Sequence, residues 1–184
     1  MENEYFDPDE DFVLDLDDAL LAEVEGTEWE EKVGALSEDT PLEERVALYQ
    51  QIRDAGVLPE DVAFFLVAWA VEAIAEERVR DIYDKQYAVR FERVMDEQGL
   101  DDDLIAILEP DELPQEYRAL QLEFAQAVDA LVAATFQTFG EHKMASLYKT
   151  NPEEFDRRYD EGYAHFFGSD EGNASDFDEE EHQD

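Results

Sequence analysis

The chain has 184 residues, of which 52 are Asp or Glu and 13 are Lys or Arg, and its formal net charge is −39. Such a chain lacks the basic surface that binding to nucleic-acid phosphates or to anionic lipid requires, and because it has no Cys it forms no disulfide and no thiolate site. Its hydrophobic fraction of 44% and aromatic fraction of 12% are too high for a chain without a folded core.

The N-terminal segment, residues 1–35, is an acidic arm, since its first 31 residues hold 14 acidic residues and no Lys or Arg. Apolar residues at steps of three and four indicate an amphipathic helix in this arm: Val13, Leu16, Leu20 and Val24. Such a helix can dock in a groove of a partner protein, with Trp29 as a further anchor, fold back on its own domain, or stay unfolded. We take these five residues as candidate partner-docking positions.

Residues 36–167 predict a single all-α domain, a bundle of about five helices with short loops. The first helix has recognisable ends, because Thr40, Pro41 and Glu43 have the spacing of a capping box and Gly56 is placed to end the helix. No segment alternates between apolar and polar residues over a strand-like period of two, so we expect no sheet.

A long central helix is expected from Pro59 to Gly99, because neither Gly nor Pro occurs between them; whether it is continuous is left open. Its first part, residues 62–74, is apolar nearly all round, which predicts a position at the centre of the bundle. Beyond it a single apolar stripe predicts a helix with one exposed face: Val79, Ile82, Tyr83, Tyr87, Phe91, Val94 and Met95.

Glu72 interrupts the apolar part of this helix and is a candidate buried acid. A carboxyl group buried there would have a raised pKa or a cationic partner, and such groups occur at sites of proton chemistry. The alternative is that Glu72 faces solvent or pairs with Arg78 or Arg80.

The remaining elements are a short turn after Asp101, a long helix from Pro114 to Gly140 and a last helix that Asn151 caps. Residues 168–184 hold eight acidic residues and no base, which predicts a disordered acidic tail. The one Glu-x-x-His spacing, at Glu179 and His182, lies in this tail. We therefore expect no metal, no cofactor and no catalytic residue.

The opening residues resemble no secretion signal, and the longest apolar run is too short for a membrane span, which needs about 20 residues. The sequence thus favours a cytoplasmic, non-enzymatic interaction module with a basic protein partner, without direct nucleic-acid binding or membrane association. Two alternatives stay open: a nucleic-acid mimic that inhibits a DNA- or RNA-binding protein, and a salt-adapted helical enzyme with an unrecognised site. The process, the partner's identity and the oligomeric state are not predicted.

Overall fold

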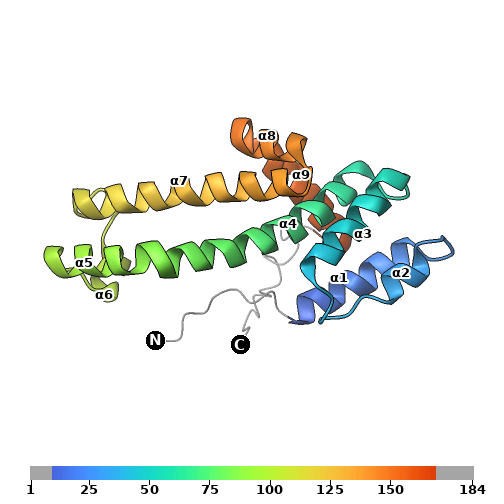
Figure 1. Ribbon diagram of the computed structural model, residues 1–184, viewed down its shortest axis with the longest axis horizontal. Coiled ribbons are helices and arrows are strands. Elements are labelled where there is room, and N and C mark those ends of the chain that lie inside the picture. The colour runs from blue at the N-terminus through green and yellow to red at the C-terminus, as the bar shows by residue number, and fades with distance from the viewer. Residues whose placement is uncertain (1–9, 169–184) are drawn as a thin grey trace, which may run out of the picture.

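The computed structural model describes residues 10–168 (Figure 1), and within this range every regular element is helical and no residue lies in a strand. The predicted all-α class is confirmed. The tail beyond residue 168, like residues 1–9, lies outside the described residues. The helices, with one π-helical turn labelled η1, run in this order: α1 (Glu10–Glu23), α2 (Glu30–Gly34), α3 (Leu42–Ala55), α4 (Glu60–Ile82), η1 (Tyr83–Tyr87), α5 (Ala88–Gln98), α6 (Asp102–Ile107), α7 (Gln115–Thr138), α8 (His142–Thr150) and α9 (Pro152–Phe167).

The long central helix is one helical run with an irregularity in its middle. α4 passes through the π-helical turn η1 directly into α5, and this run lies alongside α7 for much of its length (Figure 1). A π turn inserts one residue into the helical ladder, so it shifts the apolar stripe without ending the helix. The question that the sequence left open is thereby answered: the segment is continuous but not regular.

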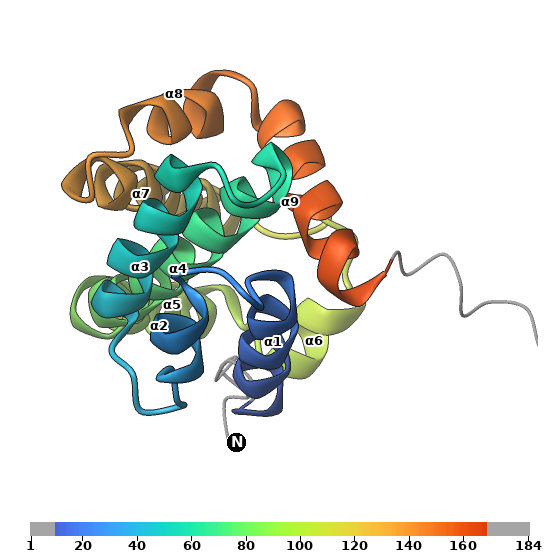
Figure 2. The ribbon, with the colours of Figure 1, turned by 90° about the vertical axis from the view of Figure 1, so that its right-hand side faces the viewer.

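The main hydrophobic core surrounds the first half of α4, as predicted. All ten residues from Val62 to Val71 are buried, and Figure 2 shows α4 enclosed by α3, α7 and α9. A fully buried large apolar side chain contributes about 1.5–3 kcal/mol. This segment therefore holds the other helices in place.

A second, smaller core lies between α5 and α7, away from the main bundle. The apolar stripe predicted beyond residue 79 contributes the buried Tyr87 and Val94, with Tyr83 and Phe91 packed against them, and α7 contributes Tyr117 and Leu120. Helices α5 and α7 and the short α6 thus form a projection with its own aromatic interior. This projection extends from the bundle (Figure 1).

Helices α1 and α2 share the main core, so the core extends across the boundary that the sequence analysis placed between residues 35 and 36. The described helices also exceed the expected five, because α1 and α2 join the bundle and no pattern in the sequence indicated α8. The reason for α8 is local: Gly140, with a φ of 78°, ends α7, and the chain starts a new helix two residues later.

The predicted capping box before α3 is wrong. Pro41 is itself extended, with a ψ of 140°, so helical backbone begins only at Leu42 and Thr40 lies one residue too early to cap α3. The hydroxyl of Thr40 accepts a hydrogen bond from the backbone N–H of Ser37 (2.9 Å) instead of capping α3. The predicted end is confirmed, since Gly56 adopts a left-handed φ of 68°.

Candidate functional site

Helix α1 is held on the bundle by a buried ion pair with α3. Asp17 Oδ2 accepts a hydrogen bond from Arg45 Nη2 (2.8 Å), and Arg45, which is 1% exposed, also donates to the carbonyl of Ser37 (2.6 Å) and to the hydroxyl of Tyr49 (3.1 Å). Burial raises the pKa of Tyr49 to about 12, so its phenol stays neutral. A buried guanidinium needs such partners because desolvation penalises its charge. The pair therefore fixes the position of α1.

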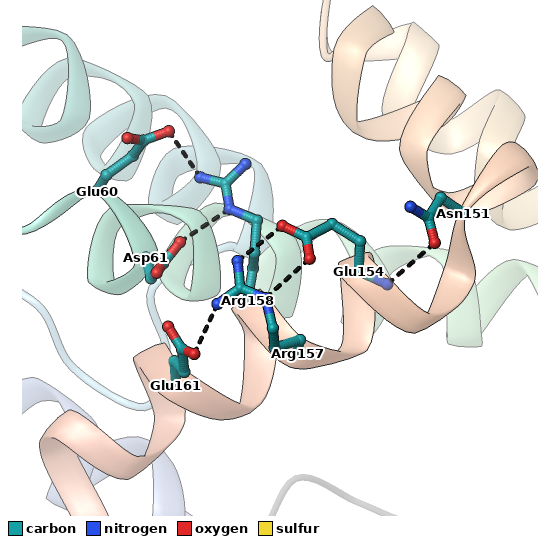
Figure 3. Close-up of polar contacts among 7 residues, drawn as sticks. All are labelled: Glu60, Asp61, Asn151, Glu154, Arg157, Arg158 and Glu161. Atoms are coloured by element: carbon teal, nitrogen blue, oxygen red, sulfur yellow. Dashed lines mark hydrogen bonds and ion pairs between the residues drawn. The ribbon is translucent and has the colours of Figure 1, made fainter.

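Helix α9 is fixed against the start of α4 by close packing and by Arg158. A Cβ at Gly162 would lie 2.2 Å from the backbone oxygen of Asp61, so only glycine permits this approach. Arg158 donates to the carboxylates of Asp61 (2.8 Å) and Glu60 (3.0 Å) across the two helices (Figure 3). Its guanidinium lies 4.3 Å from the ring centre of Phe64 and lowers the pKa of Asp61.

The cap of α9 is the one that the sequence predicts. The side chain of Asn151 accepts a hydrogen bond from the backbone N–H of Glu154 (3.3 Å), and Arg157 bridges Glu154 and Glu161 on the exposed side of the helix (Figure 3). With its start and its contact with α4 both set, α9 brings Tyr159 and Tyr163 to a cavity next to this contact.

This cavity, which we call the aromatic pocket, lies between α1, α4 and α9 and has a volume of about 460 Å³. Its walls combine aromatic rings, aliphatic side chains and charged groups: Phe12, Leu42, Trp69, Glu72, Ala73, Glu76, Glu77, Arg80, Tyr159 and Tyr163. The ring of Phe12 lies 5.8 Å from that of Trp69 and is stacked 6.4 Å from that of Tyr163, measured between centroids. Phe12 of α1 thus completes an aromatic wall together with Trp69 of α4 and Tyr163 of α9.

The charges in the aromatic pocket are predominantly negative. Among the described residues, its walls hold three carboxylates and one cation: Glu72, Glu76 and Glu77, with Arg80. Residues four apart in a helix share a face, which is why Glu72, Glu76 and Arg80 line the same cavity. Among the side chains that the structure describes, none forms a hydrogen bond or an ion pair with Glu72.

Burial and, as the smaller cause, the negative charge of Asp156 on α9 together raise the pKa of Glu72 to about 7. Of the two cations that the sequence offered as partners, Arg78 donates to the hydroxyl of Thr135 (3.3 Å) and Arg80 lines the pocket. The side chain of Glu72 is partly buried, as a group in a pocket wall is. Among the described residues, Arg80 is thus the one cation that shares the pocket walls with Glu72 and the two other carboxylates.

A second pocket, of about 550 Å³, lies between α3, α8 and α9, and its charges are largely balanced within the chain. Arg53 donates to Glu141 (2.7 Å), and Arg158 to Glu60 as described above. Since these cations already have carboxylate partners, this pocket has less unmet charge than the aromatic pocket.

The five candidate docking residues of the N-terminal arm are buried in the chain's own core: Val13, Leu16, Leu20, Val24 and Trp29. In this conformation the arm is folded back, which is one of the alternatives that the sequence left open, and the stripe is not presented to a partner. Glu72 is recognisable in the sequence by its apolar neighbours, but the aromatic walls around it are not. The spacing of Tyr159 and Tyr163 was visible, but nothing in it indicates that α1 and α4 lie opposite.

Among the described residues, no three His, Asp or Glu side chains are grouped as a metal site requires, and the Glu179–His182 spacing lies outside them. Between residues 10 and 168, no helix combines the length and apolar character that crossing a membrane demands. Comparisons of the chain with known protein families, with curated proteins and with solved structures found no match.

Proposed function

We propose that this protein is a non-enzymatic binding protein that captures a basic segment of a partner protein, with one cationic side chain of that segment seated in the aromatic pocket. The observation that carries the proposal is the composition of the pocket walls: aromatic rings from three helices, with three carboxylates against one arginine. A partner's ammonium or guanidinium group would supply the missing positive charge.

The chemistry of the walls suits an amphipathic cation. An ammonium group over an aromatic face gains about 0.5–2 kcal/mol, depending on how far it is desolvated. The aliphatic stem of a lysine or arginine can lie against the rings while its charged end reaches the carboxylates. A volume of about 460 Å³ accommodates one such side chain together with part of an apolar neighbour.

A protein partner is favoured over a small cation because of the charge of the whole chain. A net charge of −39 attracts a basic macromolecule over distances of about a Debye length and raises its rate of encounter. The same field repels nucleic acid.

The test uses the full chain and two peptides that differ only in charge: acetyl-Leu-Lys-Leu-amide and the same peptide with norleucine in place of lysine. Isothermal titration calorimetry at pH 8 should detect binding of the lysine peptide, and the norleucine peptide should bind at least tenfold more weakly. Equal affinity for the two peptides, or no binding of either, would overturn the proposal.

A pair of charge-matched variants locates the binding. Glu76→Gln removes one carboxylate from the pocket and should weaken binding of the lysine peptide roughly 10- to 150-fold, the range expected when a charge-assisted hydrogen bond is lost. Glu97→Gln removes the same charge from the exposed end of α5, far from the pocket, and should leave the affinity within about twofold. Equal losses in the two variants would point to general attraction instead of a site.

A further inference from the structure

The described groups around Glu72 come from several helices, and all of them except Arg80 are negative or uncharged. On α9 it faces Asp156, which repels it, and the phenols of Tyr159 and Tyr163. On α8 it faces Tyr148, whose hydroxyl donates to Asp129 of α7 (3.2 Å), and its own helix adds Glu76 and Arg80. The described side chains that α1 and α3 contribute to the pocket, Phe12 and Leu42, carry no charge.

The tyrosines cannot take over the role of an acid near neutral pH. Burial raises the pKa of Tyr159 and brings that of Tyr148 to about 12, so both phenols stay protonated. The carboxyl group of Glu72 lies in the pocket wall, largely buried and close to Asp156. Its pKa is near 7, so it gains and loses a proton near neutral pH.

We infer that the aromatic pocket takes up the cationic side chain of its partner in exchange for a proton on Glu72, so that the partner is held at mildly alkaline pH and released at mildly acidic pH. This inference rests on the proposed function. In the exchange, the O–H bond of the Glu72 carboxyl group breaks, the proton passes to water, and the resulting carboxylate pairs with the incoming ammonium group. No oxidant, reductant or other reactant is needed.

The size of the effect follows from the titration of one group. If only the protein with ionised Glu72 binds the cation, its affinity for the cation falls about 30-fold from pH 8 to pH 5.5. At pH 7 the binding of one cation should release about half a proton to the solvent.

The experiment is calorimetric titration of the full chain with acetyl-Leu-Lys-Leu-amide at pH 5.5, 7 and 8, in pairs of buffers with different heats of ionisation. The wild-type protein should bind about 30-fold more weakly at pH 5.5 than at pH 8 and release about half a proton at pH 7. Glu72→Gln, which mimics the protonated acid, should bind weakly at every pH and release no proton. Glu77→Gln, an exposed carboxylate of the same pocket, should keep the pH dependence.

The outcomes separate the two claims. Binding that is charge-selective but independent of pH, without proton release, would overturn the exchange and leave the proposed function standing, whereas no binding at any pH would overturn both. Carbon-13 NMR of the Glu72 carboxyl group measures its titration directly in the wild-type chain, so this test does not depend on a variant that folds correctly. The free protein should show a titration near pH 7 that moves to lower pH with the peptide, and a titration below pH 5 would refute the exchange.

Discussion

Glu72 is more easily protonated in the folded chain than in the unfolded one, and this difference ties stability to pH. Its pKa is about 7 in the fold against an ordinary value of 4.5. Between these values the folded protein holds a proton that the unfolded chain lacks, so the contribution of this group to stability falls as pH rises from about 4.5 to about 7.

Glu72→Gln should remove this dependence. Relative to the wild type, the variant should become more stable by roughly 1–2 kcal/mol between pH 5 and pH 8, a range reduced for the partial exposure of the side chain. Denaturant unfolding at a series of pH values measures the difference in the free energy of unfolding. Parallel stability curves for the two proteins would show that burial does not disfavour the charge of Glu72.

Asp17 and Arg45 form the second residue pair on which the pocket depends, because they hold α1 and with it Phe12. Asp17→Asn leaves the guanidinium of Arg45 buried with only uncharged partners, and we expect a loss of about 3 kcal/mol in the free energy of unfolding. Asp18→Asn makes the same change at the next, exposed position of α1 and should cost less than about 0.5 kcal/mol. Comparable losses in the two variants would contradict a role for the buried pair.

The contact between α4 and α9 depends on Gly162, and Gly162→Ala tests it. The added Cβ would clash with the backbone of Asp61 and with Phe65, so α9 must move away, at a cost of about 1–3 kcal/mol. Because α9 carries Tyr159 and Tyr163, binding of the lysine peptide should weaken as well. The measurements are denaturant unfolding and calorimetric titration.

Gly34→Ala is the matched control, because a Cβ there would meet only Leu21 at an ordinary contact distance of 3.8 Å. This variant should keep or slightly raise the stability, since alanine is the better helix former, and should leave binding unchanged. A tolerated Gly162→Ala with unaltered binding would refute the close approach of the two helices.

The helices themselves were largely predictable because their signals are local. The spacing of apolar residues indicates the buried face of a helix. Gly56 marks the end of α3 and Asn151 the start of α9, each within a few residues. The capping box predicted at Thr40 is wrong for an equally local reason, since Pro41 is itself extended and α3 starts one residue later than the pattern indicates. Glu72 stood out because its neighbours are apolar, but Phe12, Trp69 and Tyr163 belong to three different helices. Their meeting depends on the tertiary packing of α1 and α9, which no short pattern encodes.

The charge of the whole molecule gives stability and binding opposite responses to salt. With a net charge of −39, repulsion destabilises the compact state, and added salt screens it. Raising NaCl from about 0.1 to about 1 M should therefore increase the free energy of unfolding while it weakens binding of the lysine peptide. Unfolding and calorimetric titration at the same salt concentrations check both trends. A peptide affinity that rises with salt would indicate that apolar contact alone drives binding.

The projection formed by α5 and α7 is an alternative binding surface for the peptide, because the apolar side chains of Val89 and Leu122 are exposed on it. The measurement that decides between the two surfaces is isotope-filtered NMR of the full chain with acetyl-Leu-Lys-Leu-amide at pH 8. Nuclear Overhauser effects should connect the lysine methylenes of the peptide to the rings of Phe12, Trp69 and Tyr163. Effects that instead connect the peptide to Val89 and Leu122, with none to the three rings, would contradict a binding site in the aromatic pocket.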